Sequence, residues 1–427
     1  MSENVYILGV GMIKFGKHLD LGIKQMTGQA LDLVLKDAGL EKKDLEAAWF
    51  SNTGWGISDY QHGIRGQVAL SANGLDQIAM TNVENACASG STAFHNGWAA
   101  IKAGIYDCVL AIGAEKMYYQ VDPKSGGGRS FEGFISGTDV EETRAMMAKQ
   151  KEEARLKKEQ MEKEARERGE EIKKEDGSKG GHSIFMDFYG AGARRHMKEY
   201  GTTQRQLAVI AAKAHNNSVL NPLAQYTFPQ TVEQVMQDRI VSYPLTRAMC
   251  APIGDGAAAA ILCSENFLKK YSSSRAVLVR ASILRSGVRV GKPNDVTARA
   301  SKAAYEQAGL GPEDIHVVEV HDATAFGELV QSEDMGFCPK GEGGPFAESG
   351  ATALNGRIPI NPSGGLISRG HPIGASGLAQ MYELVTHLRG EAGKRQVKNP
   401  RIAMTENGGG TIGNGEAAMT IHILEKI

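Results

Sequence analysis

An internal repeat constrains the fold of this chain more than any other feature. Residues 37–45 read DAGLEKKDL and residues 307–315 read QAGLGPEDI, and both the glycines and the acids that follow them are 270 residues apart (39 to 309, 44 to 314). In each copy the pattern predicts an amphipathic helix that ends at the glycine, a short polar link, and an apolar strand at 47–50 or 317–320. The repeated unit is therefore a helix followed by a strand.

Strands that alternate with helices favour an α/β fold with mostly parallel sheets covered by helices. The duplication predicts two such halves packed as one unit, with the active site where they meet. CASG at 87–90 and GASG at 374–377 extend the match, since each is expected to open a helix rich in small residues. The repeat also aligns His321 with Ser51, at the carboxyl end of a predicted strand, where ligands gather in α/β sheets.

Cys87 is the candidate nucleophile. It lies in NACASGS at 85–91, where small neighbours leave room for a bulky acyl group, and a thiol needs a base or a helix N-terminus to become a thiolate near neutral pH.

Cys108 and Cys263 lie in apolar, strand-like runs and are expected to be buried and inert. The five cysteines, which also include Cys250 and Cys338, are odd in number and form no CxxC pair. They predict a reducing cytoplasm and no metal site.

Two histidine motifs follow far downstream of Cys87. They are HDA at 321–323 and GHPIGASG at 370–377, and they make His321 and His371 candidate catalytic residues. The glycines of the second motif are explained by sharp turning alone, but turning does not account for His371. NGGGT at 407–411 is consistent with a cradle of backbone amides for an oxyanion or with a plain turn.

The chain breaks the repeat pattern between the two halves. We expect an N-terminal half (1–119 and 251–270), an inserted loop domain (120–250) and a C-terminal half (271–427). Within the loop domain, residues 141–181 are dominated by charged side chains and predict a solvated helix, either a surface decoration or a docking site for a partner. The apolar cluster that includes Phe185, Met186 and Tyr189 is consistent with core packing or with the wall of an acyl pocket.

Overall charge and hydropathy exclude two classes of partner. The net charge of −1 argues against a general nucleic-acid-binding surface, and no apolar run approaches the length of a membrane span. We therefore expect a globular protein that binds neither nucleic acid nor membrane.

The motifs, in this order and spacing, resemble the thiolase superfamily, in particular its sterol-carrier-protein-type and archaeal branch. The resemblance covers nearly the whole chain and also includes KAHNN at 213–217, NPLAQ at 221–225, PIGDGAAA at 252–259 and NPSGG at 361–365. It implies a five-layered αβαβα fold of two similar halves with a loop domain inserted in the first.

The resemblance also implies roles for individual residues. Cys87 would be the acyl-accepting nucleophile, at a helix N-terminus that favours the thiolate, and His371 its base. His321 would bind the thioester oxygen and stabilise the enolate of the departing acyl-CoA. The backbone N–H groups of Cys87 and Gly409 would form a second oxyanion hole.

This chain departs from many thiolases at the second cysteine, which carries a proton to the departing enolate. The corresponding positions hold Ala323 and Asn407, so His371, Glu406 or a bound water would have to supply the proton. Asn407 and Glu406 are candidates for acid/base chemistry or for support of the loop. Coenzyme A would be a co-substrate. The resemblance further implies a homodimer and a small zinc-ribbon and OB-fold subunit, which would complete a heterotetramer and carry the only zinc.

Within the family, the run of the sequence most resembles thiolases of anaerobic toluene degradation. These cleave (S)-2-benzoylsuccinyl-CoA with CoA into benzoyl-CoA and succinyl-CoA. Two alternatives stay open: an acetoacetyl-CoA thiolase (acetyl-CoA acetyltransferase), and a non-catalytic scaffold that binds acyl-CoA. A cysteine protease fits the duplicated halves and the GHP motif poorly.

Overall fold

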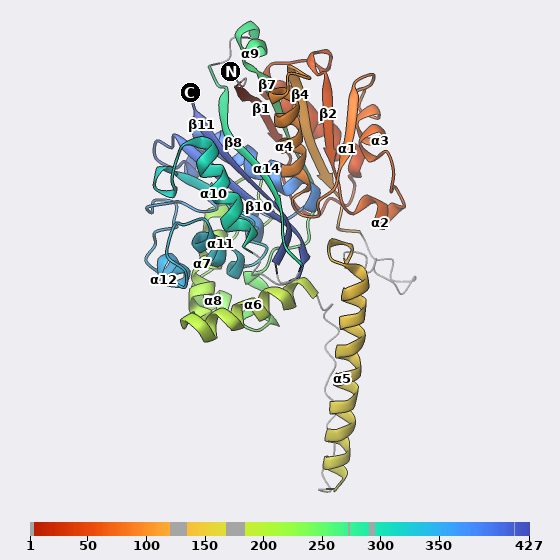
Figure 1. The fold of residues 1–427 in the computed structure, drawn as a ribbon, viewed down its shortest axis with the longest axis vertical. Helices are drawn as coiled ribbons and strands as arrows, with labels where there is room; N and C mark the ends of the chain where they lie inside the picture. The colour runs from red at the N-terminus through yellow and green to blue at the C-terminus, as the bar shows by residue number, and fades with distance from the viewer. Residues whose placement is uncertain (1–3, 120–134, 168–183, 272–273, 290–294, 414) are drawn as a thin grey trace.

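The computed structural model describes residues 4–119, 135–167, 184–271, 274–289, 295–413 and 415–427. Within these residues the fold is mixed α/β, built on a nine-stranded sheet in the order β3-β2-β4-β7-β1-β8-β11-β10-β9 (Figure 1). The strands are β1 (Val5–Met12), β2 (Ala47–Ser51), β3 (Ala79–Val83), β4 (Cys108–Glu115), β7 (Gly256–Ser264), β8 (Val277–Ser286), β9 (Val317–Glu319), β10 (Ile402–Ile412) and β11 (Gly415–Lys426).

The sheet is duplicated, as the repeat predicts. The first half runs β3-β2-β4-β7-β1, and the second runs β9-β10-β11-β8, with Ile360 bridging to β9 where the first half has β3. β2 pairs in parallel with β3 and β4, and β9 pairs in parallel with β10. The late strand of each half, β7 or β11, is antiparallel to both of its neighbours. Each half is therefore mixed, with one strand running against the others.

The two halves stack around a central pair of helices. α4 (Ser89–Lys102) and α14 (Ser376–Arg389), which follow the CASG and GASG motifs, pack against each other and against strands of both halves. α1 (Ile23–Ala38) and α3 (Arg65–Ser71) cover the outer face of the first half, and α10 (Val296–Ala308) covers that of the second. This is the predicted five-layered arrangement.

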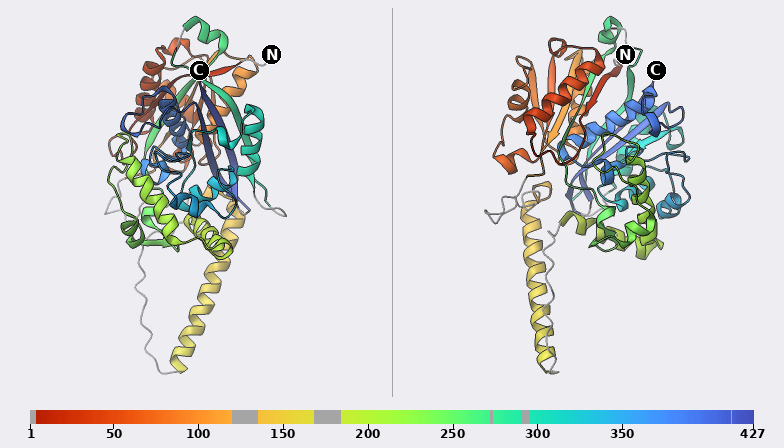
Figure 2. Two further views of the ribbon diagram at one scale, coloured as in Figure 1. Left: turned by 90° about the vertical axis from the view of Figure 1, so that its left-hand side faces the viewer. Right: turned by 180° about the vertical axis from the view of Figure 1, so that it is seen from behind.

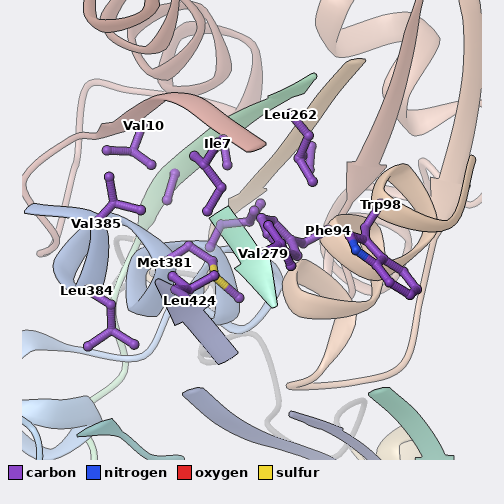
Figure 3. Packing of buried hydrophobic residues seen from close by; sticks show 14 of the residues in the cluster. Ile7, Val10, Phe94, Trp98, Leu262, Val279, Met381, Leu384, Val385 and Leu424 are labelled. Carbon is purple, nitrogen blue, oxygen red and sulfur yellow. The ribbon is translucent and has the colours of Figure 1, made fainter. Parts of the chain in front are cut away.

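Alternation along the strands separates the hydrophobic cores. In β2, Ala47 and Trp49 join the central cluster, whereas Ala48 and Phe50 join the outer cluster under α1. Figure 3 shows the central cluster, in which side chains from α4 and α14 meet those of strands from both halves. Because side chains alternate along a strand, each half-sheet is apolar on both faces.

The helix ends match the repeat pattern. Gly39 and Gly309 follow α1 and α10 in the left-handed conformation, with φ of 69° and 67°, a region that glycine enters at little cost. The backbone N–H of each glycine donates a hydrogen bond to a carbonyl in the last turn of its helix. The glycines that reveal the repeat are therefore helix C-caps.

We assign the residues between β4 and β7 to an inserted unit, because the chain rejoins the first half-sheet only at β7. Its described elements are α5 (Val140–Glu167), α6 (Ile184–Tyr200), α7 (Gln204–Ser218), α8 (Val232–Gln237), β5 (Ile240–Ser242) and β6 (Leu245–Thr246). α5 projects away from the rest of the molecule in every view (Figures 1 and 2), and the remainder of the charged insertion lies outside the described residues. The predicted charged helix is confirmed over 140–167.

The remaining α-helices of the described residues are α2 (Trp55–Asp59), α9 (Glu265–Tyr271), α11 (Ala325–Asp334), α12 (Gly343–Glu348) and α13 (Gly365–Arg369). All five cysteines are free thiols, and Cys108 lies opposite Cys263 in the buried β4–β7 pair, as expected of inert cysteines. Among the described residues, no helix combines the length and the apolar character needed to cross a membrane.

Candidate active site

Three predicted side chains meet where the halves join. Nε2 of His371 lies 3.2 Å from Sγ of Cys87, and the rings of His371 and His321 are 5.1 Å apart at 86°. Cys87 precedes α4, His371 precedes α14, and His321 follows β9. Strand and helix termini of both halves therefore converge on one point, although Cys87 and His371 are 284 residues apart in the chain.

Tight turns present the nucleophile. Ala86 has a φ of 48°, an uncommon conformation for a residue with a side chain, and the N–H of Ala88 bonds the carbonyl of Asn85 at 3.0 Å. Small residues let the two repeat-related helix starts touch. A Cβ at Gly90 would lie 2.9 Å from the carbonyl oxygen of Gly374, so the glycine is needed for this close approach.

His371 is held as a base. The hydroxyl of Ser376 donates to the carbonyl of Pro372 at 2.9 Å, so its oxygen accepts from Nδ1–H of His371 at 2.7 Å. The proton on Nδ1 leaves the Nε2 lone pair directed at the Cys87 sulfur. Burial, with the nearby His321 and Arg369, holds the pKa of His371 well below its usual value, so the free ring is neutral.

The Cys87 thiol is neutral at rest. Burial raises its pKa to about 12, although the N–H of Gly410 counters this by bonding the sulfur. This differs from the expectation that the helix N-terminus would stabilise a thiolate, because desolvation outweighs the favourable dipoles. The pair is therefore S–H donating to Nε2, and the proton moves to His371 only as the sulfur attacks.

Alkylation should report this neutral thiol. The thiolate fraction of a group whose pKa is near 12 grows tenfold per pH unit well below that value, so we expect Cys87 alkylation by iodoacetamide to accelerate steadily from pH 7 to 9 without levelling. Peptide mapping by mass spectrometry would follow Cys87 alone. A plateau below pH 8 would show a preformed thiolate and contradict the assignment.

His321 is enclosed by three partners. Its backbone N–H donates to Glu406 at 2.8 Å, its carbonyl accepts from Gln331 at 3.0 Å, and its Nδ1 lies 2.9 Å from Nδ2 of Asn407. Burial and then Arg369 lower the pKa of His321 to about 4. The imidazole is therefore neutral near pH 7, and both predicted support residues contact it from behind.

A cavity of about 130 Å³ opens in front of the three residues. Phe185, Met186 and Tyr189 of α6 line it, together with Gly408–Thr411 of β10, and the lining is mainly apolar. Ala323 and Glu416 also face it, whereas Asn407 and Glu406 do not line it. The glycine segment thus forms a wall of the pocket rather than a plain turn.

Glu416 is a pocket residue that sequence reasoning missed. It lies opposite Thr411 in the β10–β11 hairpin, and burial raises its pKa. The only feature of the sequence that could have pointed to Glu416 is its position a few residues after the glycine segment at 407–411. A carboxyl residue with a raised pKa therefore lines the cavity beside the two histidines.

The motif at 213–225 anchors the segment that leads to His371. Nζ of Lys213 donates to the carbonyl of Ile360 at 2.9 Å, Nδ2 of Asn217 donates to that of Asn361 at 3.1 Å, and Nδ2 of Asn221 donates to that of Ser363 at 2.9 Å. In the sequence, this motif stands out only by resemblance. In the structure, it ties the inserted unit to the C-terminal half.

The three catalytic candidates also form the one group of potential metal ligands found among the described residues. One donor atom each from Cys87, His321 and His371 lies within 4.8 Å of the others. Spacing along the chain does not reveal this set, because the fold brings it together. The direct S···Nε2 hydrogen bond is the geometry of a nucleophile and its base.

Two family models cover this architecture. The thiolase N-terminal domain model matches residues 5–243, and the thiolase C-terminal domain-like model matches residues 293–425. The first alone spans more than half of the chain.

Curated relatives point to the same family as the two family models. The chain is 39% identical to an acetyl-CoA acetyltransferase of Methanothermobacter thermautotrophicus, over 99% of this chain and 100% of the relative. It is 34% identical to human sterol carrier protein 2 (95% of this chain, 70% of the relative) and 31% identical to the benzoylsuccinyl-CoA thiolase subunit BbsB of Thauera aromatica (96% of each). The chain is thus more similar in sequence to the methanogen protein than to BbsB, although the run of the sequence favoured a thiolase of the benzoylsuccinyl-CoA type.

A solved structure shares the fold. The Ltp2-ChsH2(DUF35) aldolase superposes with a TM-score of 0.74 at 20% identity, over 99% of this chain and 97% of that one. The family models and the relatives show that the chain belongs to the thiolase family of acyltransferases.

Proposed function

We propose that this protein catalyses the CoA-dependent thiolytic cleavage of a β-ketoacyl-CoA through an acyl-cysteine at Cys87. The observation that carries the proposal is the 3.2 Å contact between Sγ of Cys87 and the unprotonated Nε2 of His371, at the wall of an apolar cavity. A thiol beside a neutral base in a mainly apolar pocket is suited to attack a carbonyl.

The first half-reaction forms the acyl-enzyme. His371 takes the thiol proton as Cys87 attacks the keto carbon, and the bond between the α- and β-carbons breaks. The released electron pair forms the enolate of the shorter acyl-CoA, whose oxygen accepts a hydrogen bond from His321. The protonated His371 then returns its proton to the α-carbon, which makes a second cysteine unnecessary.

The second half-reaction regenerates the thiol. The thiol of CoA gives its proton to His371 and attacks the acyl-cysteine, and the backbone N–H groups of Cys87 and Gly409 bind the resulting oxyanion. Collapse releases the acyl-CoA, and the Cys87 sulfur takes the proton back. Glu416 is a second candidate for the proton transfer at the α-carbon, because it lines the same cavity.

For the substrate, we propose (S)-2-benzoylsuccinyl-CoA, with acetoacetyl-CoA as the alternative. The aromatic and sulfur-containing lining from α6 and the similarity to BbsB support the first. The higher identity to the methanogen acetyl-CoA acetyltransferase supports the second. The described lining holds no Lys or Arg, so a free substrate carboxylate would need a cation from elsewhere.

We propose a homodimer joined by a small zinc-ribbon and OB-fold subunit in the cytoplasm. Two similar proteins support a small partner, because BbsB is a thiolase subunit and the aldolase that shares the fold includes a DUF35 component. Zinc would then belong to the small subunit, and coenzyme A would be the co-substrate.

A substrate panel tests the proposal. Thiolysis of both thioesters would be followed by CoA consumption and product chromatography, with and without a candidate small subunit. We expect efficient turnover of the benzoyl substrate in the presence of the subunit. Turnover of acetoacetyl-CoA alone would select the short-chain alternative, and no turnover of either would favour the non-catalytic scaffold.

A further inference from the structure

A buried chain of polar side chains ends on the ring of His321. Asn407 of β10 lies between Ser91, in the first turn of α4, and His321, and Thr420 lies opposite Asn407 on β11. The distances are 2.7 Å from Oγ1 of Thr420 to Oγ of Ser91, 2.7 Å from Ser91 to Oδ1 of Asn407, and 2.9 Å from Nδ2 of Asn407 to Nδ1 of His321. All four side chains are at most 3% exposed.

The chain has a defined direction. The Thr420 hydroxyl lies 2.7 Å from Ser91 and 3.2 Å from the backbone carbonyl of Asn407, so the shorter contact makes Ser91 its acceptor. The Ser91 hydroxyl proton has two acceptors, the amide oxygen of Asn407 at 2.7 Å and the carbonyl of Ala88 at 3.0 Å, and the shorter contact assigns it to Asn407. The amide nitrogen of Asn407 then faces Nδ1 and donates to it. A ring nitrogen that accepts a hydrogen bond carries no proton, so the neutral imidazole of His321 carries its proton on Nε2.

The two active-site histidines are therefore held in opposite forms. Ser376 accepts from Nδ1–H of His371 and leaves a lone pair on its Nε2, whereas Asn407 donates to Nδ1 of His321 and leaves N–H on its Nε2. One ring presents an acceptor to Cys87 and the other a donor to the substrate oxygen. Two identical side chains can thus do different work 5.1 Å apart.

We propose that Asn407 is a positioning residue that locks His321 in the Nε2–H tautomer, with Ser91 and Thr420 fixing the orientation of the Asn407 amide. The inference rests on the proposed function for its catalytic consequence. In the other tautomer a lone pair would face the developing enolate, and the stabilisation of that charge would be lost.

The direct test is the protonation of the His321 ring in the full-length protein. In ¹⁵N-histidine-labelled protein, imidazole NMR distinguishes protonated from unprotonated ring nitrogens, and His321→Gln assigns the His321 signals. We expect a protonated Nε2 and an unprotonated Nδ1 near pH 7. A proton on Nδ1 would overturn the proposal whether or not the protein is a thiolase.

Asn407→Asp tests the consequence with little change of shape. The carboxylate can only accept, so it should draw the proton to Nδ1 and raise the pKa of His321, which the same NMR signals report. We expect kcat to fall about 10²–10³-fold, the cost of losing one oxyanion donor, with KM little changed. Ser91→Ala should act in the same direction but less strongly.

A double variant separates this role from a merely structural one. His321→Gln removes the ring whose tautomer Asn407 is proposed to set, so adding Asn407→Asp to it should lower kcat little further. Full additivity of the two losses, or unchanged NMR signals in Asn407→Asp, would contradict the proposal.

Discussion

Cys87→Ser should abolish turnover while leaving the fold intact. A serine hydroxyl is a far weaker nucleophile than a thiol, and His371 lowers its barrier only partly, so we expect kcat to fall at least about 10³-fold. The substitution replaces one sulfur atom by oxygen at a pocket wall, so the free energy of unfolding should change by less than about 1 kcal/mol. Thiolysis assays and chemical denaturation measure the two effects.

Cys338→Ser is the matched control for this variant. Cys338 is also a free, half-buried thiol, but it does not line the cavity. It should retain full activity. A Cys87→Ser protein with normal turnover would show that the thiol performs no covalent step.

Gly409→Ala should damage the active site through the backbone. A Cβ at this position would collide with the carbonyl oxygen of Asn85 and lie 2.6 Å from the nitrogen of Ala88, so the loop that carries Cys87 must move. A displacement of the nucleophile by about 1 Å costs about 10²-fold in rate. We expect kcat/KM to fall at least that far, with a loss of about 1–3 kcal/mol in unfolding free energy from overpacking.

Gly16→Ala is the matched control for Gly409→Ala, because it makes the same glycine-to-alanine change at a position without a steric clash. No atom lies within 4 Å of the corresponding Cβ, so the same chemical change should leave both quantities unaltered. If Gly409→Ala kept wild-type kcat/KM, the close approach of β10 to the nucleophile loop would have no catalytic importance.

Much of the fold could be predicted, because its signals are local. The glycines at 39 and 309 end helices α1 and α10, and the strands begin where the repeat places them. The antiparallel direction of β7 and β11 has no such local signal. The hydrophobic pattern of a buried strand is the same whether it pairs in parallel or antiparallel with its neighbours. The predicted mostly parallel sheets were correct for the other strands.

The sequence predicts which residues form the site, but not the protonation state of its nucleophile. Motifs identified Cys87, His321 and His371, yet the neutral state of the thiol depends on burial, which follows from tertiary packing. Asn407 and Glu406 were expected as loop support or as a proton source. The structure places both beside His321, in contact with side chains of α4 and α11, and their roles stay predictions.

The most direct test of the central claim is mass spectrometry of the intact protein after brief incubation with benzoylsuccinyl-CoA or acetoacetyl-CoA, followed by peptide mapping. We predict one acyl adduct, benzoyl or acetyl according to the substrate, on Cys87 and on no other cysteine, removed by added CoA. An adduct on another residue, or turnover without any adduct, would contradict an acyl-cysteine mechanism at Cys87.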